Sequence, residues 1–493
     1  MSWTNIIHDL LSYDASSPML FNSGQFLFFF ILFLIAYSFL YNNKLSRTLF
    51  VLGFSFFFYY KASGWYLIVL LITLAVDYLL AHAIYKAKQQ KYRTLWLIFS
   101  LCTSLGLLAY FKYTNFFLEN WALLSGNDFE PLDIFLPIGI SFYTFQTLSY
   151  IIDVYKRELT PTNNFLDYAF YMCFFPHLVA GPIVRAKFFL PQLKSKIIMN
   201  PEEIQRGFFL IMQGLFKKAV LADYISQYND LVFAAPGTYS GFENLMAVYG
   251  YTLQIYCDFS GYSDMAIGIG LLLGFNLGIN FNKPYQALSI TDFWRRWHIS
   301  LSAWLRDYLY ISLGGNRKGK VRQYINLFIT MLLGGLWHGP SWKFVFWGGM
   351  HGLGLSIHKF WKKFVMPGEF ESKWGSKIYN LFSWFITFHF VVFLWVFFRA
   401  NDFNTAWTMI TQITSDFDMA YLSPFWDVRY LFVVLTLVGF AIHAIPAKLY
   451  PQMENLYIKK VPFIIKAAAF VLLIQLCLQF RSESVQPFIY FQF

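Results

Sequence analysis

A histidine in an uncharged, aromatic setting is the first chemical clue in this sequence. His338 stands in LLGGLWHGPSW, residues 332–342, directly after a long apolar run. Such surroundings push an imidazole towards its neutral form, and a neutral imidazole is a competent general base. The glycines beside it permit close approach of a backbone or of a narrow ligand. We therefore expect His338 to be a catalytic base; the alternative is a histidine satisfied by a neighbouring helix.

A second histidine lies in a segment that alternates aromatic and basic side chains, DFWRRWHISLSAWLRDYLYISL, residues 292–313. At helical spacing, Arg295, His298, Ser302 and Arg306 share one face, and the tryptophans and leucines share the other. This pattern predicts one continuous amphipathic helix in the membrane interface, with its tryptophans in the headgroup region.

The basic side chains of this segment are candidates for holding a phosphate-bearing acyl donor. Arg295, Arg296 and Arg306, together with Ser302, have the chemistry to bind phosphate groups. The flexible stretch GGNRKGK, residues 314–320, adds three positive charges. The alternative is that the arginines only hold the helix to anionic lipid headgroups.

The elements that position these residues belong to a membrane protein. Of the 493 residues, 57% are apolar and only 13% are charged, and many apolar stretches approach the roughly 20 residues that a crossing helix needs. These stretches lie near residues 25–41, 48–60, 66–84, 94–111, 134–152, 207–222, 245–257, 262–279, 324–337, 341–358, 380–398, 428–446 and 461–480. We expect an all-α polytopic protein with about eleven tilted transmembrane helices plus re-entrant and interfacial pieces.

The distribution of charge predicts the orientation of the chain. A net charge of +11 is not collected on one face, as nucleic-acid binding would require, but falls in alternate loops. The loops within 113–133 and 219–244 contain acidic residues and no Lys or Arg. The positive-inside rule therefore makes the basic loops cytosolic and puts both termini outside the membrane.

The chain shows no internal repeat and no soluble segment large enough to fold alone. We expect a single integral-membrane domain over residues 1–493, with a core at about 130–400. N-terminal spans are expected at 25–111, C-terminal spans at 428–480 and an external tail at 481–493. The four cysteines lack metal-site spacing, so we expect no metal. A lipid-linked glycan transporter with proton-coupling histidines is the alternative class, and it predicts repeats.

Five blocks along the chain resemble the membrane-bound O-acyltransferase family. They are PIGISFYTFQTLSYIIDVYK (137–156), FFPHLVAGPIVR (174–185), YCDFSGYSDMAIGIG (256–270), FWRRWHISLSAWLRDYLYISLGGN (293–316) and GGLWHGPSWKFVFWGGMHG (334–352). Any one block would be weak, but five in the right order are specific. The resemblance is strongest to the branch that acylates bacterial cell-surface polysaccharides such as alginate, which is related to the D-alanyl transfer system.

This resemblance implies a bundle of tilted helices around a transmembrane tunnel, with His338 and His298 as the two family histidines. It implies that an acyl thioester is taken up from the cytosol and that the acyl group, most simply acetyl from acetyl-coenzyme A, leaves on a hydroxyl acceptor outside. The expected product is an O-acetylated cell-surface or exported polysaccharide, and the expected location is the bacterial cytoplasmic membrane. A D-alanyl group on a carrier protein is the alternative donor.

Four further residues are candidates for lining the tunnel. Trp337 and Trp342 flank the catalytic histidine, His177 lies in the matching block FFPHLVAGP, and Asp258 is an acidic residue in an apolar stretch. Aromatic packing is the alternative for the tryptophans. The alternative for Asp258 is a role in capping a broken helix.

The C-terminal tail RSESVQPFIYFQF follows the last apolar stretch on the side predicted to be external. Its phenol, Tyr490, could accept the acyl group as an ester, and a similar tyrosine motif ends the small partner of the D-alanylation system. The acyl group would then pass to a secreted or membrane-tethered acetyltransferase of the SGNH-hydrolase type and on to the polysaccharide. The alternative is an aromatic tail anchored at the interface.

Overall fold

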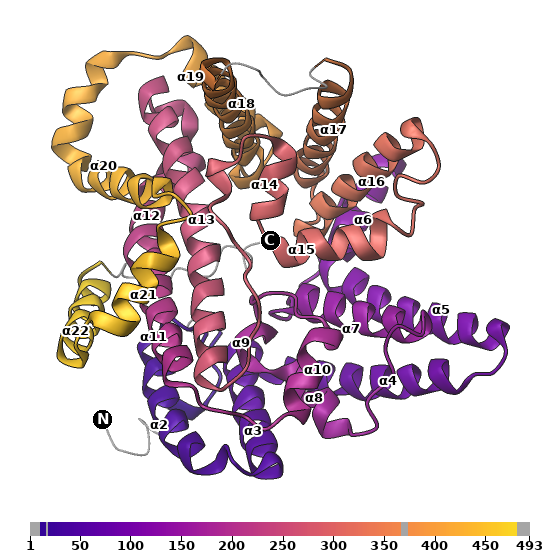
Figure 1. Ribbon diagram of the computed structural model, residues 1–493. Helices are drawn as coiled ribbons and strands as arrows, with labels where there is room; N and C mark the ends of the chain where they lie inside the picture. Colours follow the sequence, from indigo (N-terminus) through magenta and orange to yellow (C-terminus); the bar gives the residue numbers. More distant parts are fainter. Residues whose placement is uncertain (1–9, 16–17, 366–372, 481–493) are drawn as a thin grey trace. The chain divides into compact units, whose positions relative to one another are not determined.

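The computed structural model describes residues 10–15, 18–365 and 373–480 (Figure 1). Within these ranges the regular elements are all helices, which agrees with the predicted all-α class. Contacts divide the chain into two compact units, residues 1–211 with 265–278, and residues 212–264 with 279–493. Each unit is described by itself.

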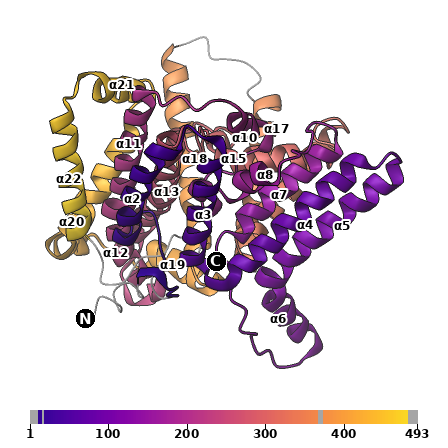
Figure 2. The ribbon, with the colours of Figure 1, turned by 90° about the horizontal axis from the view of Figure 1, so that it is seen from below.

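The first unit contains the N-terminal helices. Their bounds are α2 (Gly24–Leu40), α3 (Lys44–Ser63), α4 (Leu67–Lys86), α5 (Gln90–Leu108), α6 (Thr114–Ser125), α7 (Ile140–Tyr155), α8 (Phe165–Cys173), α9 (Phe175–Leu178), α10 (Ala186–Lys194) and most of α11 (Pro201–Leu215). Helices α4 and α5 run side by side along their length (Figure 2). Phe175 of α9 inserts between α2 and α3, with its ring 5.6 Å from Phe33 and 5.0 Å from Phe54, so aromatic packing joins these elements.

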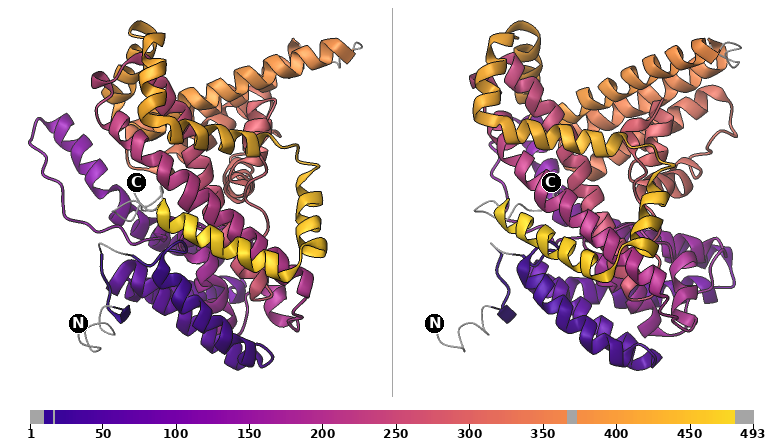
Figure 3. Two further views of the ribbon diagram at one scale, coloured as in Figure 1. Left: turned by 90° about the vertical axis from the view of Figure 1, so that its left-hand side faces the viewer. Right: turned by 60° about the vertical axis from the view of Figure 1, so that its left-hand side comes forward.

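The second unit contains the remaining helices and both candidate catalytic histidines. Their bounds are α12 (Asp223–Ala234), α13 (Gly241–Leu272, whose end belongs to the first unit), α14 (Ile290–Arg296), α15 (Ile299–Trp304), α16 (Lys320–His338), α17 (Trp342–Phe364), α18 (Lys373–Arg399), α19 (Phe403–Ser415), α20 (Leu422–Ala444), α21 (Tyr450–Lys460) and α22 (Phe463–Gln479). Helices α21 and α22 meet at a bend of 118°; Figure 3 shows both helices, in yellow, at the C-terminal end of the described chain.

Short 3-10 and π-helical segments interrupt the chain between these helices. The 3-10 turns are η1 (Gly64–Tyr66), η4 (Pro236–Thr238), η5 (Pro284–Gln286) and η7 (Met419–Tyr421), and the π segments are η2 (Ala109–Tyr113), η3 (Phe216–Ala222) and η6 (Leu305–Tyr310). Because π segments are frequent at functional sites, η3 and η6 mark two places in the second unit where function would be sought.

Long apolar helices support a multi-pass membrane protein. Four helical stretches of the described chain are long and apolar enough to cross a membrane, or up to five if the bent pair α21 and α22 is one span. This number does not confirm the expected eleven crossings. Helices α2 and α7 contain only 17 and 16 residues, fewer than the roughly 20 that a straight crossing requires.

Candidate active site

Helices α16 and α17 form a tight hairpin that fixes the position of His338. A Cβ atom on Gly335 would lie 2.2 Å from the carbonyl oxygen of Phe344, and one on Gly348 would lie 2.3 Å from that of Met331. Only glycine permits two helix backbones to approach this closely. His338 is the last residue of α16, so the glycine contacts hold it at the closed end of the hairpin.

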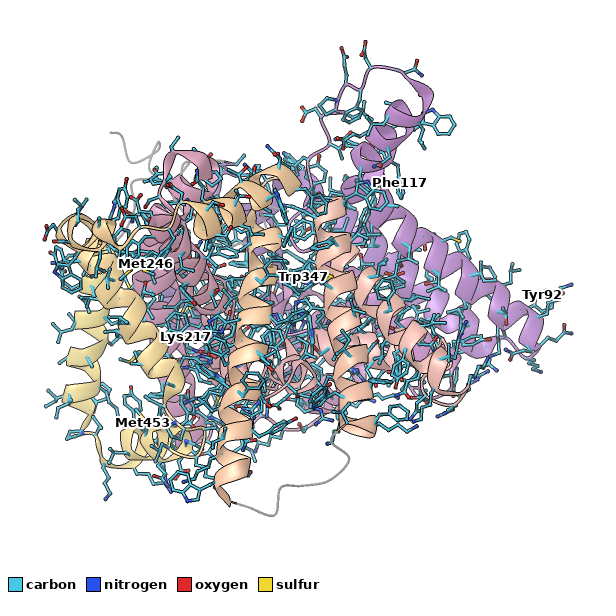
Figure 4. All side chains as sticks on the ribbon, turned by 90° about the horizontal axis from the view of Figure 1, so that it is seen from above. Tyr92, Phe117, Lys217, Met246, Trp347 and Met453 are labelled. Carbon is cyan, nitrogen blue, oxygen red and sulfur yellow. The ribbon has the colours of Figure 1, made fainter. Side chains whose placement is uncertain are left out.

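Aromatic rings surround the imidazole of His338. The ring centroid lies 5.0 Å from Trp337, 5.1 Å from Trp347 and 5.3 Å from Phe398. Trp347, labelled in Figure 4, meets the imidazole edge to face and is only 1% exposed. His338 itself is 3% exposed. These rings fix the plane of the imidazole and keep bulk water away from it.

The predicted continuous helix over residues 292–313 is wrong, because it breaks at His298. Helix α14 ends at Arg296 and α15 begins at Ile299, and His298 between them has a φ of +42°. This left-handed backbone is costly for a residue with a side chain. Asn280 compensates, since its Oδ1 accepts hydrogen bonds from the backbone N (3.2 Å) and the Oγ (2.9 Å) of Ser300.

The same asparagine sets the tautomer of His298. Nδ1 of His298 lies 3.2 Å from Oδ1 of Asn280, and because an amide oxygen only accepts, Nδ1 donates. The basic nitrogen of the neutral ring is therefore Nε2. The side chain is fully buried, and its segment is not one of the long apolar spans. Burial lowers the pKa of His298 to about 3, so the ring is neutral at physiological pH.

Trp337 joins the two histidines. Its ring centroid lies 6.4 Å from that of His298 and 5.0 Å from that of His338, and its side chain is 5% exposed. The sequence separation of the two histidines gave no reason to expect them near each other. The structure brings both rings against the same indole, which makes this part of the second unit the candidate active site.

The aromatic face of this segment lies inside the protein rather than in the headgroup region, so that prediction is wrong. Its members are each at most 8% exposed: Trp294, Trp297, Leu301, Trp304 and Tyr308. Trp297, for example, packs against Trp395 of α18 with ring centroids 5.0 Å apart. The hydrophobic surface of α14 and α15 is therefore buried against neighbouring helices.

A cavity of about 390 Å³ brings together three of the four predicted donor-binding residues. Arg295, Ser302 and Arg306 line it, although His298 does not share their surface as the helical pattern predicted. Leu305 of η6 and Trp294 of α14 form part of its apolar wall. The cavity thus combines basic groups with an apolar wall, as a thioester with a charged head would need.

A second cavity, of about 470 Å³, is strongly basic. One of its lining side chains, Asp292, is acidic. Five are cationic: Arg295, Lys320, Lys359, Lys362 and Lys363. It shares Thr291, Arg295 and Lys359 with the first cavity. Arg296, the fourth predicted donor residue, lines neither cavity and pairs instead with Asp292 at 2.9 Å. The shared residues make the two cavities one candidate site for a polyanionic ligand.

Asp258 takes part in a buried ion-pair cluster that the sequence did not reveal. Lys218 lies in the π segment η3, is 2% exposed, and pairs with both Asp258 and Asp223, the latter at 2.7 Å. The neighbouring Lys217 pairs with Asp264 at 2.7 Å. Asp258 lines neither the 390 Å³ cavity nor the 470 Å³ cavity.

The other predicted site residues lie apart from this centre. His177 belongs to the first unit, where it is buried and its Nε2 donates to the carbonyl oxygen of Tyr171 at 2.9 Å. Trp342, at the start of α17, is 58% exposed. Tyr490 lies outside the described residues.

His351 is a neighbour of the site to which the sequence gave no role. Its Nδ1 accepts a hydrogen bond from Nε1 of Trp294 at 3.3 Å, and its ring lies 4.6 Å from that of Trp347. Trp347 therefore contacts both His338 and His351. The spacing of Trp347 and His351, one helical turn apart, was the only available hint that they share a face.

Comparisons with known proteins confirm the resemblance. The profile of the membrane-bound O-acyltransferase family matches residues 153–400. A peptidoglycan O-acetyltransferase of Helicobacter pylori is 40% identical over 421 residues, which cover 79% of this chain and 78% of the relative. A probable alginate O-acetylase of Pseudomonas putida is 37% identical over 501 residues, which cover 96% of this chain and all of the relative.

A more distant relative is named for the transfer of a different acyl group, D-alanyl. A teichoic acid D-alanyltransferase of Bacillus subtilis is 28% identical over 289 residues, 56% of this chain and 71% of the relative. The family match includes both histidines and the two cavities of the candidate site. The chain therefore belongs to the membrane-bound O-acyltransferase family and is a multi-pass membrane O-acyltransferase.

Proposed function

We propose that this protein transfers an acetyl group from a cytosolic thioester to a hydroxyl acceptor outside the cytoplasmic membrane, for O-acetylation of a cell-surface or exported polysaccharide. The observation that carries the proposal is the contact of His298 and His338 with one indole, Trp337, in the unit that also contains the basic cavities. Relatives named for acetylation of peptidoglycan and alginate support a polysaccharide acceptor.

His338 acts as the general base in this scheme. Its imidazole removes the proton of the acceptor hydroxyl while that oxygen forms a bond to the thioester carbonyl carbon. Collapse of the tetrahedral intermediate breaks the carbon–sulfur bond, and the imidazolium returns its proton to the leaving thiolate. The products are an ester and a free thiol, so His338 is regenerated without any other reactant.

His298 has the supporting role. Its Nδ1 donates to Asn280, so Nε2 is the basic nitrogen of the ring, the one that takes part in donor positioning or proton relay. His298 therefore positions the donor or relays a proton, while His338 performs the deprotonation.

The donor is acetyl-coenzyme A. The five cationic side chains of the basic cavity complement its phosphates, and the adjoining apolar wall at Leu305 and Trp294 complements the uncharged arm that ends in the thioester. Arg295 and Lys359 line both cavities and would hold the phosphate nearest the arm. A D-alanyl group on a carrier protein, suggested by the name of the B. subtilis relative, is the alternative donor.

The membrane arrangement completes the proposal. About eleven tilted helices form a single domain around a tunnel, in the bacterial cytoplasmic membrane with both termini outside. Trp342, His177 and Asp258 remain candidates for lining that tunnel. Tyr490 is the candidate acceptor that hands the acyl group to an external acetyltransferase of the SGNH-hydrolase type.

The test uses purified protein and acetyl-coenzyme A with a radiolabelled acetyl group. His338→Ala should lower the rate of acetyl release or transfer by about 100- to 10,000-fold, the usual contribution of a general base. His82→Ala is the matched control, because His82 lies in the first unit, on α4, and its Nδ1 bonds the carbonyl oxygen of Tyr78. It should keep wild-type turnover.

Three results would decide between the functions. Full turnover in His338→Ala would remove the catalytic assignment. An inactive wild type, given donor and a hydroxyl acceptor, would favour the glycan transporter. Mass spectrometry of the C-terminal peptide under single-turnover conditions tests Tyr490, and a peptide without acetyl would exclude it as the intermediate acceptor.

A further inference from the structure

One face of α16 runs from the donor cavity to the catalytic histidine. Leu327, Met331, Gly334 and His338 follow one another at intervals of three or four residues and therefore share this face. Leu327 and Met331 line the 390 Å³ cavity. From Met331 to His338 the helix advances by about 10 Å, so the thioester must move past Gly334 to reach the base.

Gly334 is covered differently from its neighbours Gly335 and Gly339. A Cβ atom on Gly335 would lie 2.2 Å from the backbone oxygen of Phe344, and one on Gly339 would lie 2.2 Å from the ring of the same residue. At Gly334, among the described residues and apart from its chain neighbours and the helix's own backbone, the atoms within 4 Å of such a Cβ are the methyl carbons of Leu305, at 3.1 and 4.0 Å. A single flexible side chain therefore separates the Gly334 backbone from the cavity that Leu305 also lines.

We infer that Leu305, lying over Gly334, is a specificity gate that admits small, uncharged acyl groups from the donor cavity to His338. This inference rests on the proposed function, because it assumes that the thioester travels from that cavity. Leu305 is 5% exposed and begins the π segment η6. A change of its side-chain rotamer opens the passage beside Gly334 without movement of α16.

Two physical properties of the gate select the acyl group. The proposed passage starts at the cavity lined by Leu305 and Met331 and runs beside Gly334, so its width depends on the Leu305 side chain that covers this glycine. A branched acyl group is wider than the part of the coenzyme A arm next to the thioester, whereas an acetyl group is not. The same apolar walls offer no partner to an α-ammonium group, so a D-alanyl thioester is excluded by desolvation.

The experiment compares acetyl- and isobutyryl-coenzyme A as donors for wild type, Leu305→Ala, Gly334→Ala and the double variant. Leu305→Ala should raise the isobutyryl-to-acetyl ratio of kcat/KM by about tenfold or more, because the smaller side chain leaves space for the two methyl groups of isobutyryl. Gly334→Ala should lower kcat/KM for both donors by about tenfold, because its Cβ presses on Leu305. The double variant should recover acetyl transfer, because each change offsets the other.

Gly349→Ala is the control, since its Cβ would make only an ordinary contact, 3.5 Å, with Phe328. It should retain wild-type rates and donor preference. An unchanged donor ratio in Leu305→Ala overturns the gate; should that variant not fold, an unchanged ratio in Leu305→Val does the same. The absence of acetyl transfer from wild type would instead remove the proposed function itself.

Discussion

At the scale of single residues, the indole of Trp337 decides how the two histidines lie. It contacts His298 on one side and His338 on the other, at centroid distances of 6.4 and 5.0 Å. Trp337→Ala should lower kcat for acetyl transfer by about 100-fold, because a displacement of about 1 Å in a catalytic group has effects of that size. The KM for the donor should change little, since Trp337 lines neither donor cavity.

Two further variants make this measurement decisive. Trp337→Phe should retain more activity than Trp337→Ala, because a smaller ring still separates the imidazoles. Trp407→Ala is the control, because Trp407 on α19 is 64% exposed, and it should leave kcat near the wild-type value. A rise in KM with an unchanged kcat in Trp337→Ala would assign Trp337 to donor binding instead.

The sequence pointed to His338 and His298 as candidates, but it did not reveal that both rings lie against Trp337. His338 was identifiable because its apolar, glycine-rich surroundings are local in sequence. The break at His298 could not be predicted, because its left-handed backbone depends on hydrogen bonds accepted by Asn280, 18 residues away. Helical periodicity records only neighbours along the chain, so it placed His298 on the same face as Arg295 and Arg306.

At the scale of elements, the π segment η3 brings two lysines into the interior. Lys218 is 2% exposed and pairs with Asp223 and Asp258. Lys218→Met would remove the cation that pairs with the buried carboxylate of Asp258 and the partly buried carboxylate of Asp223, so we expect the unfolding free energy to fall by about 3–5 kcal/mol. The measurement is the midpoint of thermal unfolding of the purified variant in detergent.

An exposed lysine supplies the comparison. Lys86→Met, at the end of α4, removes one positive charge from a surface side chain and should leave the midpoint unchanged within about a degree. Equal midpoints for Lys218→Met and Lys86→Met would contradict a structural role for the buried cluster. A large drop confined to Lys218→Met would support it.

The same ion pairs explain an error in the predicted helices. Residues 258–261, DFSG, separate the apolar stretches 245–257 and 262–279; this gap begins with Asp258, and the second stretch contains Asp264. The structure has one helix, α13, from Gly241 to Leu272, because Lys218 and Lys217 neutralise these carboxylates. A partner distant in sequence allows a charge inside an apolar helix, and periodicity alone does not reveal such partners.

At the scale of the whole molecule, the orientation in the membrane connects the candidate site to its substrates. The basic cavity must face the cytosol for a soluble thioester to reach it, and the positive-inside rule gives its Lys-rich loops that side. The same rule puts the acidic loop of 113–133 outside. Asp128 and Lys318 are exposed residues in the two kinds of loop.

Cysteine labelling tests this orientation in intact cells. The background substitution is Cys102→Ser, because Cys102 is the one native cysteine that is exposed. In this background, a maleimide that does not cross the cytoplasmic membrane should label Asp128→Cys from outside. Lys318→Cys should react only after the membrane is permeabilised. Labelling of both positions from the same side would contradict the predicted orientation. In that case the basic cavity could not bind a cytosolic donor while the acyl group leaves on the opposite face of the membrane.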